Sequence, residues 1–258
     1  MIYTSKIQKA IKFAIKTHEV YQKQKRKGKD IAYITHPLTV GIILSQSKAS
    51  EDAIVAGILH DTIEDSTEDK KVSAEMIEER FGKEVSDLVL SITEKDKGLS
   101  WAERKKQALE HIQNFSHDSL LIKSADIVAN VSELLDDYAR YEDSVFARFN
   151  APKTKIIKHQ LEAICSIVQK WKENPLTEDL KFLADKLQMI ESTKFMSQNP
   201  AKVIKYKDYD ENEKLECPAC GWKGTPRESG FIESGDYCLD VSCPICGKML
   251  LVADFPKA

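Results

Sequence analysis

The sequence predicts an all-α domain followed by a small β domain that binds zinc. Apolar residues recur every three to four positions along most of the first 190 residues, a spacing typical of amphipathic helices packed around one core. Five of the six cysteines follow residue 216, where the pattern Cys-Pro-x-Cys-Gly occurs twice. At 258 residues with 42% hydrophobic content, the chain suits one large domain and a small appendage.

Charge and the first residues of the chain exclude several classes of protein. The formal net charge is only −3 at pH 7, which argues against a generic nucleic-acid-binding protein. The start lacks the basic-then-apolar order of a signal peptide, and no apolar run is long enough to span a bilayer. We therefore expect a cytoplasmic protein with no membrane partner, whose clustered cysteines bind metal rather than form disulfides.

The first three helices lead to the most informative segment. The spacing predicts a helix over residues 5–20, and a polar loop over 21–30 follows it. Pro37 is predicted to open the second helix at its first position. The residues expected to face inward on that helix are Leu38, Val40, Ile42, Ile43 and Leu44. Ser50 is the expected cap of a central helix that is apolar nearly all round and extends to residue 65.

Start and stop signals also mark the remaining helices. Gly82 separates two short helices, and Ser100 with Glu103 forms a capping-box signature. Cys165 falls on the predicted inner face of a closing helix, where a free cysteine behaves as a small hydrophobe. These helices are expected over residues 73–81, 83–93, from 100 onward, 120–131, 152–171 and 177–190.

The central helix ends in four ionisable side chains. On a helix, His60 would lie one turn below Glu64 and Asp61 one turn below Asp65, so that both pairs project along one side. Burying such a cluster without a partner would cost on the order of several kcal/mol per charge. We therefore expect a divalent metal ion at this position.

Side chains on other helices could complete the metal shell. His36 lies at the mouth of the second helix, and Lys123, Asp126 and Asn130 form a polar stripe along an apolar helix. Asp126 is either neutralised by Lys123 in a salt bridge or a second carboxylate ligand. Two imidazoles and two carboxylates suit Mn²⁺, Fe²⁺ or Zn²⁺ better than Ca²⁺. The candidate ligands are His36, His60, Asp61 and Asp126.

Acidic and basic residues near this shell suggest hydrolysis of a phosphate ester. Glu64 and Asp65 would orient a water molecule or shuttle its proton. The loop residues Lys25, Arg26 and Lys27 are either solvated or bind phosphate groups.

These motifs together resemble the HD superfamily of metal-dependent phosphohydrolases, and within it the RelA/SpoT-like branch with its small stand-alone hydrolases. The resemblance covers residues 6–171 and does not extend to the cysteine-rich tail. The segments that carry it are Tyr33–Pro37, Leu59–Asp65, Glu103–Lys105, and Lys123–Asp126 with Asn130. It implies an HD-domain helical bundle, which we expect over residues 1–196.

The resemblance also implies a reaction and residue roles. The reaction is removal of the 3′-pyrophosphate from guanosine tetra- or pentaphosphate with Mn²⁺ in the site, although some stand-alone members act on the 2′-phosphate of NADPH. Glu64 and Asp65 would be the catalytic pair, and Asn130 a nucleoside contact. The candidate substrate contacts are Lys25, Arg26, Lys27, Arg104, Lys123 and Asn130.

The tail predicts a four-cysteine zinc ribbon over residues 215–258, after a linker over 197–214. Its two repeats place paired thiolates on two tight turns, which complete a tetrahedral Zn²⁺ site. Short strands are expected over 237–241 and 249–252, and Cys238 is a spare thiol or a competing ligand. The candidate zinc ligands are Cys217, Cys220, Cys243 and Cys246.

Two classes of function remain open at this stage. The first is an enzyme that acts on a nucleotide substrate. The second is a module that senses a nucleotide without cleaving it, with a ribbon that contacts nucleic acid or a protein. Basic residues of the ribbon are offset by acidic ones, which favours a structural or protein-contact role for it.

Overall fold

The computed structural model describes residues 3–94, 98–198, 202–217, 222–229, 232–234, 238–244 and 249–255. The chain divides into two compact units, Met1–Leu187 and Gln188–Ala258. Among the described residues, no helix combines the length and the apolar character needed to cross a membrane.

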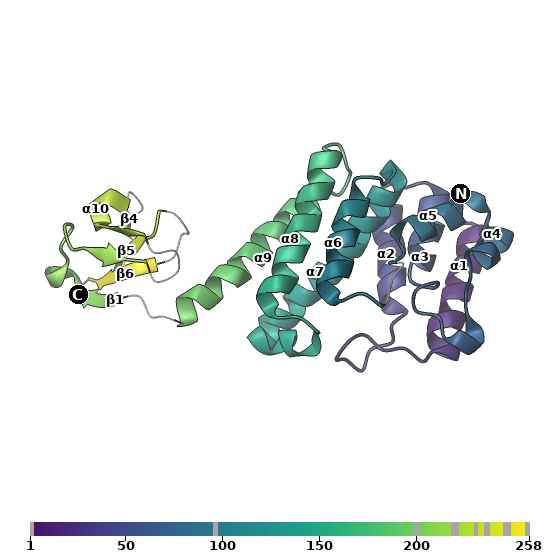
Figure 1. The fold of residues 1–258 in the computed structure, drawn as a ribbon, viewed down its shortest axis with the longest axis horizontal. Helices are drawn as coiled ribbons and strands as arrows, with labels where there is room; N and C mark the ends of the chain where they lie inside the picture. Colours follow the sequence, from purple (N-terminus) through teal and green to yellow (C-terminus); the bar gives the residue numbers. More distant parts are fainter. Residues whose placement is uncertain are drawn as a thin grey trace. The chain divides into compact units, whose positions relative to one another are not determined.

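The elements of the first unit are helices, as the sequence predicts, and one isolated antiparallel β-bridge joins Lys25 and Ala32 (Figure 1). Three of its described elements are not α-helices, because η1 is a π-helix and η2 and η3 are 3₁₀ helices. The elements are α1 Ser5–Ile15, η1 Lys16–Tyr21, α2 Thr35–Gln46, α3 Glu51–Leu59, η2 Glu68–Lys70, α4 Ala74–Phe81, α5 Lys83–Ile92, α6 Trp101–Ile112, α7 His117–Tyr141, η3 Glu142–Arg148 and α8 Lys153–Lys170. Helix α9, Thr177–Gln198, begins in this unit.

Helix α3 is the centre of the bundle. Every residue from Ala53 to Leu59 is buried, and α3 packs against α1, α2, α5 and α7. Ser50 caps the helix as predicted, since its side chain accepts a hydrogen bond from the amide of Ala53. The capping box of Ser100 and Glu103 is also present at the start of α6. These two capping signals therefore determine where α3 and α6 begin, and both helices contribute residues to the site described below.

The predicted continuation of the central helix to residue 65 is wrong. Helix α3 ends at Leu59, and His60 is its C-cap. The carbonyl of Leu59 accepts hydrogen bonds from the Thr62 amide at 2.9 Å and from the Thr62 hydroxyl at 2.7 Å. This local pairing tightens the chain into a turn, because a threonine hydroxyl competes with the helical hydrogen-bond pattern.

Three further details differ from the prediction. Helix α2 begins at Thr35, so Pro37 is its third residue rather than its first. Ile42 is 59% exposed, and Cys165 is exposed instead of lying in the core. Each residue advances about 100° around a helix, so Cys165, next to the buried Ile164, points away from the core.

Gly57 permits the close approach of α2 to α3. A Cβ atom at this position would lie 2.2 Å from Leu44 Cδ1 and 3.2 Å from Val40 Cγ1. We expect Gly57→Ala to lower the free energy of unfolding by about 1–3 kcal/mol, since overpacking forces shifts in a dense core. Denaturant unfolding measures the change. Ser45→Ala, on the exposed face of α2, is the control and should stay within about 0.5 kcal/mol of wild type.

The described residues of the second unit form two small sheets. The larger has the strand order β1-β6-β5-β4, with β1 parallel to β6 and the other pairs antiparallel. One core cluster spans both sheets, and its buried residues are Leu215, Cys217, Val241, Cys243, Leu250, Leu251 and Ala253. The strands are β1 Lys202–Lys205, β2 Leu215–Glu216, β3 Lys223–Gly224, β4 Ile232–Ser234, β5 Cys238–Ser242 and β6 Met249–Asp254, with η4 Tyr206–Asp208 and α10 Pro226–Ser229.

One part of this unit was not expected from the sequence pattern. The stretch 197–214, where the sequence predicts a linker, contains β1, whose backbone pairs with β6. The last residues of α9 also fall in it. Strands β5 and β6 occur close to the predicted strands over 237–241 and 249–252.

Candidate active site

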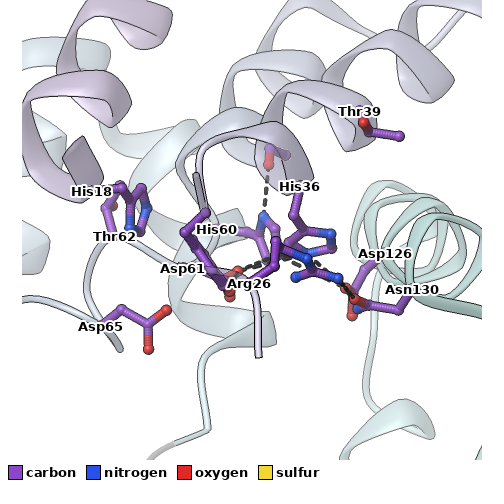
Figure 2. Close-up of polar contacts among 12 residues, drawn as sticks. His18, Arg26, His36, Thr39, His60, Asp61, Thr62, Asp65, Asp126 and Asn130 are labelled. Atoms are coloured by element: carbon purple, nitrogen blue, oxygen red, sulfur yellow. Dashed lines mark hydrogen bonds and ion pairs between the residues drawn. The ribbon is translucent and has the colours of Figure 1, made fainter. Parts of the chain in front are cut away.

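Three side chains from three helices meet at a compact metal site. His36 lies in the first turn of α2, His60 at the end of α3 and Asp126 in the middle of α7. One ligand atom from each lies within 4.8 Å of the other two. The two Nε2 atoms are 3.3 Å apart, and His36 Nε2 is 3.2 Å from Asp126 Oδ1 (Figure 2). Ligand atoms about 2.1 Å from one ion and at right angles lie roughly 3 Å apart, so this spacing fits a metal ion.

Asp61 lies beside this group. Its Oδ2 atom is 3.0 Å from His60 Nε2 and 3.7 Å from His36 Nε2. The hydroxyl of Tyr33 donates to the same oxygen at 2.5 Å. All four predicted ligands therefore lie close together, and the three whose ligand atoms are mutually within 4.8 Å are His36, His60 and Asp126.

The orientation of His60 suits metal binding. Its Nδ1 lies 2.8 Å from the carbonyl oxygen of Gly57, which can only accept a hydrogen bond. Nδ1 therefore carries a proton, and Nε2, which faces the other candidate ligands, is the nitrogen whose lone pair becomes available to a metal ion once its own proton is lost. A set of two imidazoles and carboxylate oxygens is the donor type that divalent transition metals prefer.

Electrostatics at the site favour a bound cation. Burial alone would lower the pKa of His60, but the charge and hydrogen bond of Asp61, the charge of Asp126 and the hydrogen bond to the Gly57 carbonyl together outweigh burial and raise that pKa to about 9. Burial would likewise raise the pKa of Asp126, but the ammonium group of Lys123 and the neighbouring His36 hold it well below its usual range. The carboxylates are thus ionised, and they attract positive charge to the space between them.

Lys123 and Asn130 both bond to Asp126. Lys123 Nζ is 2.8 Å from Oδ2, and Asn130 Nδ2 donates to Oδ1 at 2.6 Å. Asp126 therefore forms the predicted salt bridge with Lys123 through Oδ2, while Oδ1 faces the histidines, where a metal ligand would have to lie. Asn130 also accepts a hydrogen bond from Arg26 at 2.8 Å, so it links the basic loop to the metal site.

The predicted catalytic acids lie at the edge of the metal site. Glu64 Oε2 is 3.4 Å from the amide of Glu94, which donates to it, and Asp65 Oδ2 accepts a hydrogen bond from Gln24 at 3.0 Å. Burial raises the pKa of Glu64, and the charges of Asp61 and Glu94 raise it further. Figure 2 shows Asp65 to one side of the ligand cluster, on the side where His18 also lies.

A cavity of about 620 Å³ adjoins the metal site. Asp126, Glu64 and Asp65 all line it. So do all six predicted substrate contacts, Lys25, Arg26, Lys27, Arg104, Lys123 and Asn130. The cavity is therefore rich in cationic side chains, and it reaches the metal site at Asp126.

Sequence reasoning missed part of the cavity wall. Trp101 on α6 and His159 on α8 line it, with their rings 6.1 Å apart at an interplanar angle of 73°. Lys105, Arg148 and Phe149, which are not among the six predicted substrate contacts, line it as well. The basic run that starts at Arg104 gave a signal for Lys105, whereas no local pattern marks His159, because its role depends on the packing of α6 against α8.

Glu133 secures the basic loop to α7. Its carboxylate accepts hydrogen bonds from Arg26 and, at 2.6 Å, from Lys29. Burial would raise the pKa of Glu133, but the hydrogen bonds and charges of Arg26 and Lys29 together outweigh burial and lower the pKa to about 2. A carboxylate with a depressed pKa stabilises the fold above its unfolded pKa of about 4.5, and this contribution is lost as the pH falls from there to about 2.

We therefore expect Glu133→Gln to destabilise the protein at pH 7 by about 1–2 kcal/mol, with a smaller difference from wild type at pH 3. Denaturant unfolding at the two pH values measures this. Asp136→Asn, an exposed neighbour on α7, is the control. A difference that is equal at both pH values would contradict the assigned ion pairs.

The predicted zinc ligands are described only in part. Cys217 and Cys243 are both buried in the core of the second unit. Cys220 and Cys246 lie outside the described residues.

Comparison with known proteins agrees with this geometry. The HD-domain family model matches residues 10–157. Guanosine-3′,5′-bis(diphosphate) 3′-pyrophosphohydrolase MESH1 of Xenopus tropicalis is 36% identical over 130 residues, which are 50% of this chain and 69% of that protein. The human MESH1 is 33% identical over 127 residues, 48% of this chain and 67% of that protein.

Solved structures share the fold. A metazoan ortholog of SpoT that hydrolyses ppGpp aligns with a TM-score of 0.55 at 24% identity, covering 74% of this chain and 97% of that one. The protein lmo0812 of Listeria monocytogenes aligns with a TM-score of 0.53 at 27% identity, covering 60% of this chain and 97% of that one. With its His36, His60 and Asp126 metal site, the chain belongs to the HD-domain family and is a phosphohydrolase related to the guanosine-3′,5′-bis(diphosphate) 3′-pyrophosphohydrolases.

Proposed function

We propose that this protein is a Mn²⁺-dependent hydrolase that removes the 3′-pyrophosphate from guanosine 3′,5′-bis(diphosphate). The observation that carries the proposal is the cavity that joins the metal site to a set of lysine and arginine side chains. A nucleotide with two diphosphate groups has the charge that such a wall would bind. The related proteins named for this reaction support the choice of substrate.

The metal would be held by His36, His60, Asp61 and Asp126. When bound, it supplies Lewis-acid activation of water and of a phosphoryl oxygen. The raised pKa of Glu64 suits a group that takes a proton from the attacking water at its carboxylate. Asp65, held by Gln24, orients that water.

A second group of residues would bind the pyrophosphate. Lys105 and Arg104 both pair with Glu94, so one carboxylate faces two cations, and Lys123 lies near it. Among the described residues, the buried Nε atom of Arg104 has no hydrogen-bond partner. This unmet donor and the excess of positive charge favour an anion at this part of the wall.

A substrate panel tests the proposal. The protein is incubated with guanosine 3′,5′-bis(diphosphate), GTP and NADPH in the presence of Mn²⁺, Fe²⁺, Zn²⁺ or Ca²⁺. We expect pyrophosphate release from the first nucleotide, fastest with Mn²⁺ and absent with Ca²⁺. Faster orthophosphate release from NADPH would favour the 2′-phosphatase alternative, and no release from any nucleotide would favour a non-hydrolytic sensor.

For the second unit, we propose a zinc site formed by Cys217, Cys220, Cys243 and Cys246, with a structural or protein-contact role. The two Cys-Pro-x-Cys-Gly repeats support it, as does the burial of Cys217 and Cys243, one from each repeat, in one small core. Elemental analysis of the wild-type protein should find one zinc ion per chain. The Cys217→Ser variant should contain no zinc. Cys165→Ser, an exposed cysteine of the first unit, should leave the zinc content unchanged.

A further inference from the structure

His18 is a fully buried histidine that the reaction described above does not use. It lies in η1, a π-helix, and π-helical turns occur often at functional sites. Its Nδ1 atom is 3.0 Å from Oε1 of Gln24. The carbonyl oxygen of an amide can only accept, so the Nδ1–H of His18 is the donor.

This hydrogen bond determines the orientation of the Gln24 amide. With Oε1 turned toward His18, the Nε2 group of Gln24 points to Asp65 and donates to its Oδ2 at 3.0 Å. If the amide were reversed, an oxygen would face the carboxylate, and two acceptors repel each other. The donor on His18 therefore selects the orientation in which Gln24 supports Asp65.

Hydrogen bonds also hold the backbone of Gln24 on both sides. Its amide donates to the carbonyl of His18 at 2.9 Å, and its own carbonyl accepts from the amide of Tyr33 at 2.9 Å. The ring of His18 also packs against the ring of Tyr33, with centroids 5.1 Å apart. His18 and Asp65 lie on the same side of the ligand cluster in Figure 2, and Asp126 and Asn130 lie on the other.

We propose that His18 is a positioning residue that orients the carboxylate of Asp65 through the side chain of Gln24. The inference rests on the proposed function, in which Asp65 orients the attacking water. His18 itself touches neither substrate nor metal, and it acts through two successive hydrogen bonds.

Three variants test the relay. His18→Leu removes the donor and keeps an apolar side chain in the buried site, His18→Asn retains an amide N–H near the place of Nδ1, and Gln24→Leu removes the middle of the relay. With guanosine 3′,5′-bis(diphosphate), we expect His18→Leu and Gln24→Leu each to lower kcat about 10–100-fold. The KM and the Mn²⁺ content should stay within about twofold of wild type. His18→Asn should recover most of the lost rate, which a merely structural role would not predict.

The double variant decides whether the two residues act in one path. If His18 acts only through Gln24, His18→Leu in the Gln24→Leu background should cause no further loss of kcat. A wild-type kcat in His18→Leu, or a double variant that loses the product of both single effects, would overturn the proposal. If His18→Leu does not fold, the kcat of His18→Asn is compared with that of Gln24→Leu. A kcat of His18→Asn as low as that of Gln24→Leu would then overturn the proposal.

A readout without turnover separates this inference from the proposed function. In the wild-type protein, one side-chain amide proton of Gln24 should exchange slowly with solvent by NMR, because it is bonded to Asp65. In His18→Leu this protection should be lost, and in His18→Asn it should persist. Unchanged protection in His18→Leu would overturn the relay even if the wild-type enzyme cleaved none of the nucleotides, a result that would refute the proposed function instead.

Discussion

His60→Ala and Asp126→Ala are each expected to abolish turnover, with kcat reduced by at least about 1,000-fold. Each change removes one of the three side chains whose ligand atoms lie within 4.8 Å of one another. The remaining donors would hold a divalent ion more weakly, so the bound metal should fall in parallel. Steady-state kinetics together with elemental analysis of the same preparations measure both quantities.

His111→Ala is the matched control, because His111 is exposed near the end of α6. It should keep wild-type metal content and turnover. A His60→Ala protein that lost its metal and still hydrolysed the substrate within tenfold of the wild-type rate would show that the histidine and aspartate group is not the reaction centre.

Glu64→Gln and Asp65→Asn should lower kcat by about 10²–10⁴-fold while leaving the bound metal in place. The substitutions keep the size of each side chain and remove its capacity to hold a proton or a charge. Because the pKa of Glu64 is raised, its carboxylate becomes protonated at a higher pH than an ordinary glutamate does. The wild-type kcat should therefore fall as the pH is lowered through that pKa, and the kcat of Glu64→Gln should not show this fall. A pH profile of kcat measures it.

Glu68→Gln is the control variant for Glu64→Gln and Asp65→Asn. Glu68 lies in the exposed helix η2, a few residues beyond the site. Its replacement should not change kcat or the pH profile. Loss of metal in Glu64→Gln, equal to that in His60→Ala, would instead assign Glu64 to the ligand shell.

The parts of the site that were predictable depend on local signals. The cap at Ser50 and the apolar run after it place His60 and Asp61 at the end of a buried helix, and the spacing of Lys123, Asp126 and Asn130 places them on one stripe of α7. Such features need only helical periodicity and the high cost of burying charge.

Other features depend on tertiary contacts or on competing hydrogen bonds. The turn after Leu59 forms because Thr62 bonds to the Leu59 carbonyl, an interaction that apolar periodicity does not reveal. Likewise, β1 belongs to a sheet only because its backbone pairs with β6, some 50 residues away in the sequence. Trp101 and His159 share a wall because α6 and α8 pack together, and no sequence pattern links them.

Identification of the products tests the central claim most directly. The protein is incubated with Mn²⁺ and guanosine 3′,5′-bis(diphosphate), with His60→Ala as the blank, and the mixture is resolved by anion-exchange chromatography and ³¹P NMR. Removal of an intact 3′-pyrophosphate predicts GDP and pyrophosphate in equal amounts. Unchanged nucleotide, or orthophosphate with no pyrophosphate, would contradict it.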